Sequence, residues 1–260
     1  VDVEPETLCI DPKKIVNAIS KRTKVILPVH FGGMSSNIFE INKISRKYNI
    51  DIVEDAAHAT GTKFEKNKIG SHSSAVCFSF HPVKNLAMPT GGLVSINHSK
   101  HKIFRKQLQE RRWCGITNRK DTDYDVKEIG WNYYMNELSA AIGLEQLKKL
   151  DKMNKLRKSI ANQYQKHITA DSKMPFDINC SYHLYWILVK NRNEFREKLF
   201  ENGIETGTHY KPIHLMKMYK QKRKLPVTEK VGKEIVTLPI HPNLKKSDID
   251  KIVKLTNRFL

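Results

Sequence analysis

Residues 24–53 read KVILPVHFGGMSSNIFEINKISRKYNIDIV, and this stretch decides the predicted fold. Lys24–Val29 is mostly apolar and predicts a buried strand. Residues 37–48 predict a helix, and a short apolar strand follows at Asp51–Val53. The helix has apolar residues at helical spacing, namely Ile38, Ile41, Ile44 and Tyr48. Strands joined through a helix in this way pair in parallel.

The segments on either side extend this pattern. Upstream, Asp11 as N-cap and Pro12 at the first helical position predict a helix that continues through Ile15 and Ile19. Downstream, the pattern predicts two strands and a basic helix, at Ser74–Phe80, Gly92–Ile96 and about Ser99–Arg112. The predicted fold class is therefore α/β, with a mostly parallel sheet that is covered by helices.

A long helical pattern starts at Asn136 and runs through Ile160. It is longer than an ordinary globular helix, so we expect a bend or a break in it. We interpret residues 136–170 as a helical bridge between a large domain, residues 1–135, and a small α/β or α+β domain, residues 171–260. The small domain is predicted to contain one strand and two helices, at Tyr182–Val189, Asn193–Asn202 and Ser247–Phe259.

The chain is long enough, at 260 residues, to bury a substantial core. It begins Val1-Asp2-Val3, which reads as the end of a strand. We therefore expect the N-terminal part of the large domain to lie outside this chain.

The net charge of +19 and the pI near 9.7 raise the possibility of nucleic-acid binding. The densest basic run, Lys217–Lys224, holds five basic residues but only one aromatic, Tyr219. Because the charge is otherwise spread along the chain, a solvated basic surface is favoured and no nucleic-acid partner is expected.

The four cysteines lie far apart and form no C-x-x-C pair: Cys9, Cys77, Cys114 and Cys180. Neither a zinc site nor a disulfide framework is indicated, and reduced thiols are expected. The chain has no apolar run that could span a bilayer and no signal-peptide pattern. These features predict a cytoplasmic protein without a membrane partner and without a metal.

Two predicted strands end in residues that can carry chemistry. One closes as Val53-Glu54-Asp55-Ala56-Ala57-His58-Ala59, and the other as Cys77-Phe78-Ser79-Phe80-His81-Pro82-Val83-Lys84-Asn85. Ligands of open α/β sheets sit beyond the carboxyl ends of strands. Taken alone, Lys84 is most simply a surface amine and Asp55 a helix cap. Together they supply the amine and the carboxylate that pyridoxal phosphate (PLP) requires.

At these residues the chain resembles the DegT/DnrJ/StrS family of nucleotide-sugar aminotransferases, which have the type I PLP-enzyme fold. The resemblance covers essentially the whole chain in order. Besides the two strand ends, it includes Gly91-Gly92, Asn132-Tyr133 with Met135-Asn136, Ala140–Leu144, His209–His214 and Leu238–Pro242.

The resemblance implies that Lys84 forms the Schiff base with PLP and that Asp55 binds the ring nitrogen. It also implies that Ala57 packs against the ring face, that His58 binds the phenolic oxygen and that Ser79 binds the phosphate. For Ala57, ordinary core packing explains the residue nearly as well, and an internal strand hydrogen bond is the alternative for Ser79.

The resemblance further implies a homodimer with shared active sites, because Asn132 matches an asparagine that reaches the phosphate from the neighbouring subunit. Tyr210 and His214 lie in the segment that matches the substrate-side loop, although it is also explained as an ordinary loop.

The activity implied is amino transfer from glutamate to a keto group of a nucleotide-linked sugar, in pathways to surface polysaccharide, lipopolysaccharide or antibiotics. A PLP-dependent sugar dehydratase is a related alternative, but dehydratases of this family replace the lysine, whereas Lys84 is present. A catalytically silent basic protein that binds an anionic partner and an inactive fragment are the other readings.

Overall fold

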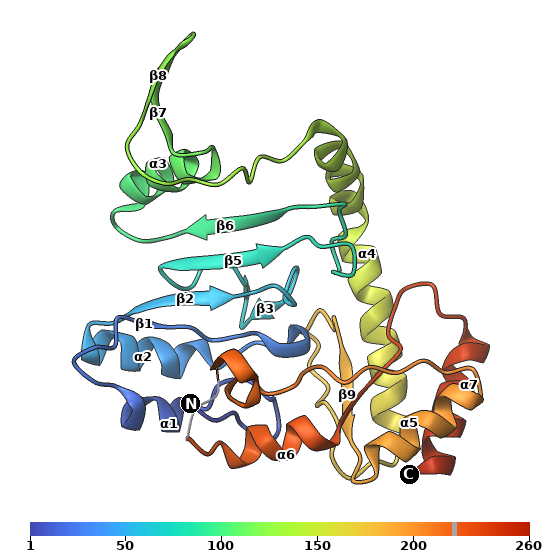
Figure 1. Cartoon of the computed structure of the whole chain (residues 1–260). Coiled ribbons are helices and arrows are strands. Elements are labelled where there is room, and N and C mark those ends of the chain that lie inside the picture. The colour runs from blue at the N-terminus through green and yellow to red at the C-terminus, as the bar shows by residue number, and fades with distance from the viewer. Residues whose placement is uncertain (220–222) are drawn as a thin grey trace.

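The computed structural model describes residues 1–219 and 223–260, so the middle of the basic run Lys217–Lys224 lies outside the described residues. A four-stranded sheet and a mainly helical C-terminal half lie side by side, joined by the long helix α4 (Figure 1). The strands are β1 (Val25–Ile26), β2 (Asp51–Asp55), β3 (Lys63–Phe64), β4 (Asn67–Lys68), β5 (Ala75–Ser79), β6 (Gly92–Ile96), β7 (Ile116–Lys120), β8 (Asp123–Val126), β9 (Tyr185–Leu188) and β10 (Ile235–Leu238). The α-helices are α1 (Pro12–Ile15), α2 (Ile38–Tyr48), α3 (His101–Arg112), α4 (Glu137–His167), α5 (Arg192–Glu201), α6 (Pro226–Glu234) and α7 (Lys246–Phe259). The 3₁₀ turns are η1 (Val16–Ala18), η2 (Phe31–Gly33), η3 (Ile213–Leu215) and η4 (Lys217–Tyr219).

The sheet has the strand order β1-β2-β5-β6. β1 pairs with β2 in parallel, and β2 pairs with β5 in parallel. β6 then returns antiparallel to β5. The predicted α/β class with a mainly parallel sheet is confirmed. In the β2–β5 register Asp55 lies opposite Cys77, so both strands end at the same edge of the sheet.

The strand–helix–strand unit folds as its pattern predicts. Asn37 caps α2 by accepting a hydrogen bond from Glu40 N at 3.2 Å, and the helix ends at Asn49, whose φ of 50° is left-handed. The apolar stripe of α2 packs on the sheet in a small core cluster of Ile15, Ile26, Ile41, Ile50 and Ile52. Burial of this stripe fixes α2 against β1 and β2.

Two upstream elements are shorter than predicted. The ladder of β1 stops at Ile26, because Pro28 has no N–H to donate, and pairing resumes only at the Val29–Asp55 bridge. The helix predicted through Ile19 ends as α1 plus the turn η1. There Ser20 and Thr23 bond to the local backbone and compete with further helical turns.

Helix α4 is a single unbroken element of 31 residues, so the expectation of a break is wrong, while that of a bend stays a prediction. It contains no proline, and Asn136 caps it by accepting from Ser139 N at 2.8 Å. Gly143 leaves room for Met88, since a Cβ there would lie 2.7 Å from the Met88 sulfur. The helix therefore continues past the sheet into the C-terminal half (Figure 1).

Polar side chains on the buried face of α4 bind main-chain carbonyls on both sides of the helix. Asn154 Nδ2 donates to Thr60 O at 3.0 Å, on the sheet side. Arg157 donates to Tyr182 O and Ile240 O, and Tyr164 donates to Pro239 O, all three in the C-terminal half. Helix α4 thus links both halves through backbone groups that would otherwise be buried without partners.

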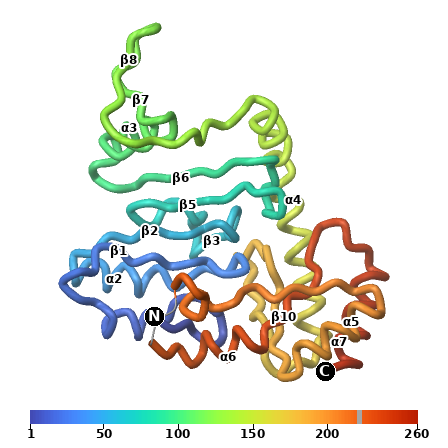
Figure 2. The backbone as a smooth tube through the Cα atoms, viewed as in Figure 1, coloured from blue at the N-terminus to red at the C-terminus, as the bar shows by residue number. Residues whose placement is uncertain are grey.

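The C-terminal half holds the largest hydrophobic cluster. β9 and β10 pair antiparallel, with Trp186 opposite Thr237, and their completely buried residues include Tyr185, Trp186, Ile187 and Val236. The first residues of the chain reach this half, as the N-terminus beside α6 shows (Figure 2). Asp2 accepts from Val227 N at 3.0 Å and from Thr228 N at 2.8 Å, and so caps α6.

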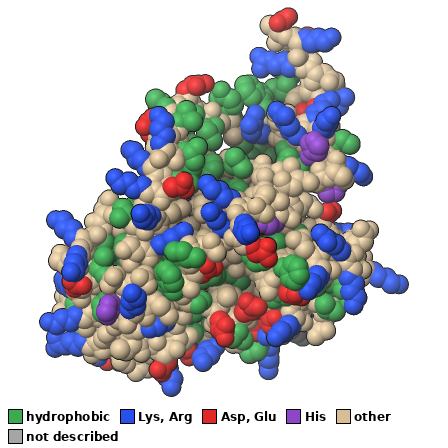
Figure 3. Space-filling view, turned by 180° about the vertical axis from the view of Figure 1, so that it is seen from behind, with side chains coloured by type: hydrophobic (Ala, Val, Ile, Leu, Met, Phe, Trp, Pro, Cys, Tyr) green, Lys and Arg blue, Asp and Glu red, His purple; other side chains and the backbone are tan. Residues whose placement is uncertain are grey.

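An antiparallel hairpin of β7 and β8, which the sequence pattern did not predict, projects beyond α3 (Figure 1). Lys and Arg side chains are scattered over the visible face and do not form one stripe (Figure 3). Within residues 1–219 and 223–260, every helix is too short or too polar to cross a membrane. The division at residues 135 and 170 into large domain, bridge and small domain stays a prediction.

Replacing Arg157 tests the linking role of α4. Arg157→Ala removes the donors to Tyr182 O and Ile240 O, so we expect the free energy of unfolding to fall by about 3 kcal/mol in urea denaturation. Lys155→Ala, at an exposed position on the same helix, should change it by less than about 0.5 kcal/mol. Equal effects of the two changes would show that the carbonyl contacts contribute nothing.

Candidate active site

Asp55 is the last residue of β2, and this strand has a neighbouring segment on each side. Asp55 N donates to Pro28 O at 2.9 Å, and His30 N donates to Asp55 O at 3.0 Å. On the other side β2 pairs with β5. The side chain is fixed as well, because Oδ1 accepts from Ala57 N at 2.9 Å. Among the described residues, Oδ2 has no hydrogen-bond donor, so it is available to a ligand.

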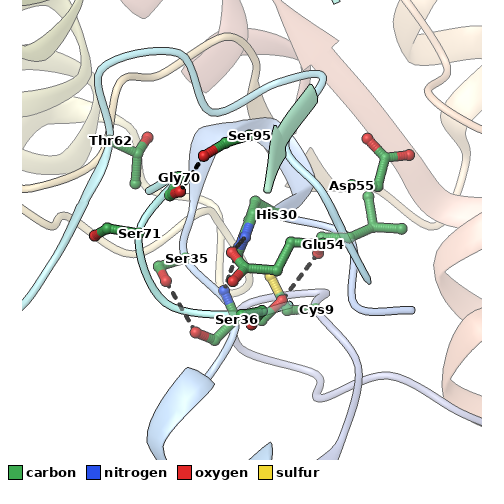
Figure 4. Close-up of polar contacts among 12 residues, drawn as sticks. Cys9, His30, Ser35, Ser36, Glu54, Asp55, Thr62, Gly70, Ser71 and Ser95 are labelled. Atoms are coloured by element: carbon green, nitrogen blue, oxygen red, sulfur yellow. Dashed lines mark hydrogen bonds and ion pairs between the residues drawn. The ribbon is translucent and has the colours of Figure 1, made fainter. Parts of the chain in front are cut away.

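The residue before Asp55 points to the opposite face of the sheet. Glu54 Oε2 lies 2.7 Å from His30 Nε2, and both side chains are completely buried. His30 Nδ1 accepts from Ser36 N at 3.0 Å, so the ring proton is on Nε2 and is donated to Glu54. Figure 4 shows this pair on one side of the strand and the Asp55 carboxyl group on the other.

Lys84 lies in the loop that joins β5 to β6. Its own N–H donates to His81 O at 2.8 Å, and the loop is closed by Met88 N donating to Phe80 O at 2.9 Å. Leu86 and Met88 are buried in the loop and pack with Leu150 of α4. The Lys84 amine is half-buried, and burial lowers its pKa although the nearby Asp55 carboxylate acts in the opposite direction. The lysine and the aspartate are therefore within electrostatic reach of each other.

His58 is buried beside these two residues. Its Nδ1 accepts from Gly32 N at 3.2 Å, so the proton is on Nε2, which lies 3.3 Å from the Tyr210 hydroxyl. The two rings are stacked with centroids 6.0 Å apart. Burial, reinforced by the charge of Lys84, lowers the pKa of His58 to about 3. The imidazole is thus neutral and can donate from Nε2.

Two more histidines come from the C-terminal half. His183 packs against His58 with ring centroids 4.4 Å apart, and burial lowers its pKa to about 2. His209 Nδ1 lies 2.8 Å from Thr237 Oγ1, and burial and the Lys84 charge lower its pKa. For Tyr210, burial and the Asp55 carboxylate raise the pKa of the phenol. The site is therefore built by the sheet edge and the C-terminal half together.

Close approach of the chain around His58 requires a glycine at position 33. Gly33 has a φ of 96°, and a Cβ there would lie 2.7 Å from Ser181 Oγ and 3.1 Å from His58 O. Ser181 Oγ itself donates to His58 O at 3.2 Å. Any side chain at position 33 would push apart the segments that carry His58 and His183.

The predicted site residues do not all gather in one place. Asp55, Ala57, His58, Lys84 and Tyr210 come together, and Ser79 ends β5 nearby, where its Oγ accepts from His81 N at 3.4 Å and keeps its proton free to donate. Asn132 is exposed in the segment after β8, where it forms a bridge with Trp113. His214 is buried, and its Nε2 lies 3.1 Å from Glu229 Oε1 of α6.

Sequence reasoning did not single out several residues that build or support the site, namely His30, Gly32, Asn85, Asn154 and His183. One of them left a readable signal: Asn154 interrupts an apolar helical stripe four residues after Leu150. His183 and Asn85 are 98 positions apart, and only the folded chain brings them together.

A cavity of about 390 Å³ lies at the opposite, amino ends of β2 and β5. It is lined by polar side chains such as Arg46, Ser73, Ser74 and His98. Because Asp55 and Lys84 lie at the carboxyl ends, this cavity takes no part in the site described above.

The residues at the carboxyl edge fit PLP. The Lys84 amine has a lowered pKa, a carboxylate oxygen of Asp55 is free to accept from a ring nitrogen, and the neighbouring residue, Ala57, is small. His58 Nε2 is a fixed neutral donor, and Ser79 offers a hydroxyl proton. These are the groups needed for the amine, the ring nitrogen, the phenolic oxygen and the phosphate of the cofactor.

Comparison with known proteins agrees with this chemistry. The model of the DegT/DnrJ/EryC1/StrS aminotransferase family matches residues 1–256. An uncharacterized protein of Methanocaldococcus jannaschii is 33% identical over 283 residues, an alignment that covers 100% of this chain and 73% of that protein.

Solved structures give the same result. The chain superimposes on Helicobacter pylori PseC, an aminotransferase of pseudoaminic acid biosynthesis, with a TM-score of 0.91 at 27% identity, covering 100% of this chain and 72% of that one. For CalS13, a sugar aminotransferase from Micromonospora echinospora, the TM-score is 0.90 at 26% identity, covering 99% and 73% of the two chains.

The buried histidines predict how stability depends on pH. The folded state keeps His58 and His183 neutral, whereas the unfolded chain protonates both below the ordinary pKa of 6.5. Stability is therefore present above pH 6.5 and is lost as the pH falls, by about 1.4 kcal/mol per pH unit for each histidine.

Urea denaturation between about pH 7 and pH 4 measures this slope. In the double variant His58→Asn, His183→Asn, the slope of the free energy of unfolding against pH should be smaller by about 2.7 kcal/mol per pH unit. His101→Asn, a change at an exposed histidine of α3, should leave the slope unchanged. A double variant with the same slope as the unmodified protein would contradict the neutral assignment.

Proposed function

Because the chain belongs to the DegT/DnrJ/EryC1/StrS aminotransferase family, we propose that it transfers an amino group from glutamate to a keto group of a nucleotide-linked sugar. It is an enzyme, a PLP-dependent sugar aminotransferase. The nucleotide, the identity of glutamate as donor and the roles of single residues are the parts that we propose.

One observation carries the proposal. Lys84 and Asp55, from different strand ends, lie close enough that the charge of Asp55 acts on the pKa of the Lys84 amine. Parallel pairing of β2 with β5 supports this arrangement, because it brings the two carboxyl ends to one edge. An amine facing a carboxylate across a ligand site matches the demands of PLP.

When bound, PLP supplies an electrophilic carbonyl carbon for the amine and a ring that withdraws electrons once its nitrogen is protonated. Lys84 Nζ is the proposed nucleophile, and its lowered pKa increases the fraction that is neutral and reactive. The same amine, once free, would move a proton between the substrate carbon and the C4′ carbon of the cofactor. One side chain thus holds the cofactor and moves the proton.

Asp55 Oδ2 is the proposed acceptor for the ring nitrogen, which a neighbouring carboxylate keeps protonated. The Ala57 N–H holds the other oxygen in place. We assign Ala57 to the ring face, His58 Nε2 to the phenolic oxygen and Ser79 Oγ to the phosphate. In this assignment His58 exchanges the 3.3 Å contact with Tyr210 for a cofactor oxygen.

The loop after Gly207 is the proposed substrate side. The Tyr210 ring is half-exposed next to His58, so its hydroxyl can reach a ligand. His214, in the same loop, is tied to Glu229 and holds the loop against α6. The positively charged surface favours a nucleotide diphosphate as the carrier of the sugar.

We further propose a homodimer in which Asn132 reaches the phosphate in the partner's site. Large apolar side chains around Asn132 support this arrangement, since Trp131 is 58% exposed and Tyr133 is 68% exposed. Such patches mark interaction surfaces. The free state of all four cysteines supports a cytoplasmic location. Surface polysaccharide or lipopolysaccharide synthesis is the proposed pathway class.

The alternatives lead to different observations. A sugar dehydratase of this family would lack the lysine that Lys84 provides. A basic anion-binding protein would bind polyanions with a steep salt dependence and would show no imine absorption with PLP. An inactive fragment would take up PLP poorly, if at all.

Replacement of the lysine tests the cofactor assignment. Purified protein mixed with PLP should absorb in the visible range, and borohydride should fix one PLP on the peptide that contains Lys84. Lys84→Ala should abolish this covalent label, because it removes the amine on which the Asp55 carboxylate acts. Lys68→Ala, which removes an exposed lysine of β4, should label like the unmodified protein. Labelling of Lys84→Ala to the same extent would refute the assignment.

Mixed dimers test the role of Asn132. Lys84→Ala and Asn132→Ala proteins should each be nearly inactive, but a mixture refolded together should recover up to about a quarter of the unmodified activity. The reason is that half of the dimers are mixed and each has one intact site. No recovery, in a mixture shown to exchange subunits, would place Asn132 and Lys84 in the same subunit's site.

A further inference from the structure

Asn85, the residue after Lys84, is buried and makes three side-chain hydrogen bonds. Its Nδ2 donates to Asn154 Oδ1 of α4 at 2.9 Å and to Ser181 O at 2.9 Å. Its Oδ1 lies 3.2 Å from His183 Nδ1. One amide thus joins the β5–β6 loop that carries Lys84, here called the lysine loop, to α4 and to the C-terminal half.

These contacts determine the orientation of each group. Both Nδ2 protons of Asn85 point at acceptors, so Oδ1 must be the acceptor for His183, whose proton is then on Nδ1. Asn154 accepts from Asn85 and uses its own amide nitrogen on Thr60 O at 3.0 Å. The donors and acceptors of this polar cluster, Asn85, Asn154 and His183, therefore match without conflict.

The cluster also reaches the residue that we assign to the phenolic oxygen. His183 packs on His58 at 4.4 Å between ring centroids. Asn85 Oδ1 accepts from His183 Nδ1, and Gly32 N donates to His58 Nδ1. Each ring of the pair is therefore fixed by one hydrogen bond. A change at Asn85 is therefore expected to affect both Lys84 and His58.

The lysine loop has a second, apolar anchor that does not depend on Asn85. Leu86 and Met88 are buried next to Leu150, and Phe80 and Met135 pack against them. This anchor fixes where the loop lies. It does not fix the direction of the Lys84 side chain, because Lys84 lies between Phe80 and Leu86 and is not itself part of this cluster.

We propose that Asn85 is a positioning residue of the active site, whose buried amide orients Lys84 toward Asp55 and, through His183, holds the His58 ring. The proposal rests on the proposed function in one respect, the role of Lys84 as the cofactor lysine. The geometric part concerns the protein alone and can be tested without the cofactor.

Four titratable groups lie within electrostatic reach of the Lys84 amine. The Asp55 carboxylate at the end of β2 raises the pKa of the amine. The charge of Lys84 in turn lowers the pKa of His58, of His183 and of His209. Burial dominates, and it lowers the pKa of the amine from 10.5. Release of the loop into solvent would move this pKa back toward 10.5.

Competitive acetylation measures this effect in the protein without cofactor. Acetic anhydride is applied in trace amounts from about pH 6 to pH 11, and the peptide containing Lys84 is quantified by mass spectrometry. In Asn85→Ala the midpoint for Lys84 should rise by about one pH unit. A parallel titration with PLP, followed by absorbance, should show Kd about tenfold higher. Asn85→Ser serves as the second variant if Asn85→Ala does not fold.

Asn154→Ala is the matched control. It removes one hydrogen bond of Asn85 and the bond to Thr60 O. The hydrogen bonds of Asn85 to Ser181 O and to His183 stay in place. It should lower Tm as much as Asn85→Ala does while leaving the Lys84 midpoint within about 0.3 pH units. An unchanged midpoint in the Asn85 variants, or an equal shift in Asn154→Ala, would overturn the proposal.

The two parts of the experiment separate this proposal from the proposed function. If unmodified protein binds no PLP while the Asn85 variants still shift the Lys84 midpoint, the positioning role stands and the cofactor assignment fails. If PLP labels Lys84 but neither variant shifts the midpoint, the cofactor assignment stands and the positioning role fails.

Discussion

The backbone of Asp55 is held from two directions, and the rest of the site depends on this constraint. The segment Pro28–His30 bonds to its N–H and C=O, and β5 pairs along its other side. A strand end with two neighbours cannot fray as an edge does. The Asp55 carboxylate is therefore fixed relative to the β5–β6 loop that carries Lys84, and a ligand that needs both groups finds them at a set separation.

The same constraint explains the buried pair on the other face of the sheet. Alternation along β2 sends Glu54 inward when Asp55 points outward. A buried carboxylate without a donor would be costly, and His30 supplies the donor from the very segment that bonds to Asp55. Glu54 and His30 thus strengthen the pairing of the Pro28–His30 segment with β2, so the sequence Glu54-Asp55 serves the fold with one side chain and the site with the next.

Sequence patterns predicted the parts of the molecule that depend on local periodicity. The α2 stripe, the start of β2 at Asp51 and the long helix α4 were all predictable, because each is set by residues a few positions apart. The C-terminal ends of β1 and α1 could not be predicted in this way, since they depend on the missing N–H of Pro28 and on the side-chain hydrogen bond of Ser20. The β7–β8 hairpin was missed, because β7 carries charged residues without alternation and β8, which does alternate, has only four residues, all of them exposed. His183 and Asn85 were beyond reach for a different reason: their roles arise from a contact across 98 positions.

The site joins segments from both halves of the chain, and α4 explains how it can do so. The halves contact each other directly, for example where Ser181 Oγ donates to His58 O, and in addition each binds the same helix. Asn154 holds Thr60 and Asn85 on the sheet side, and Arg157, one turn further, holds Tyr182 next to His183. Asn154 and Arg157 are three residues apart, which is about 4.5 Å along the helix axis. The Lys84 loop and the segment of His183 are therefore attached to α4 at nearly the same place. If the C-terminal half shifted while these bonds stayed intact, α4 would shift with it, and so would the loop that carries Lys84. This turn of α4 therefore sets where the two halves lie relative to each other, whereas the bonds of Asn85 to Ser181 and His183 orient the loop at Lys84.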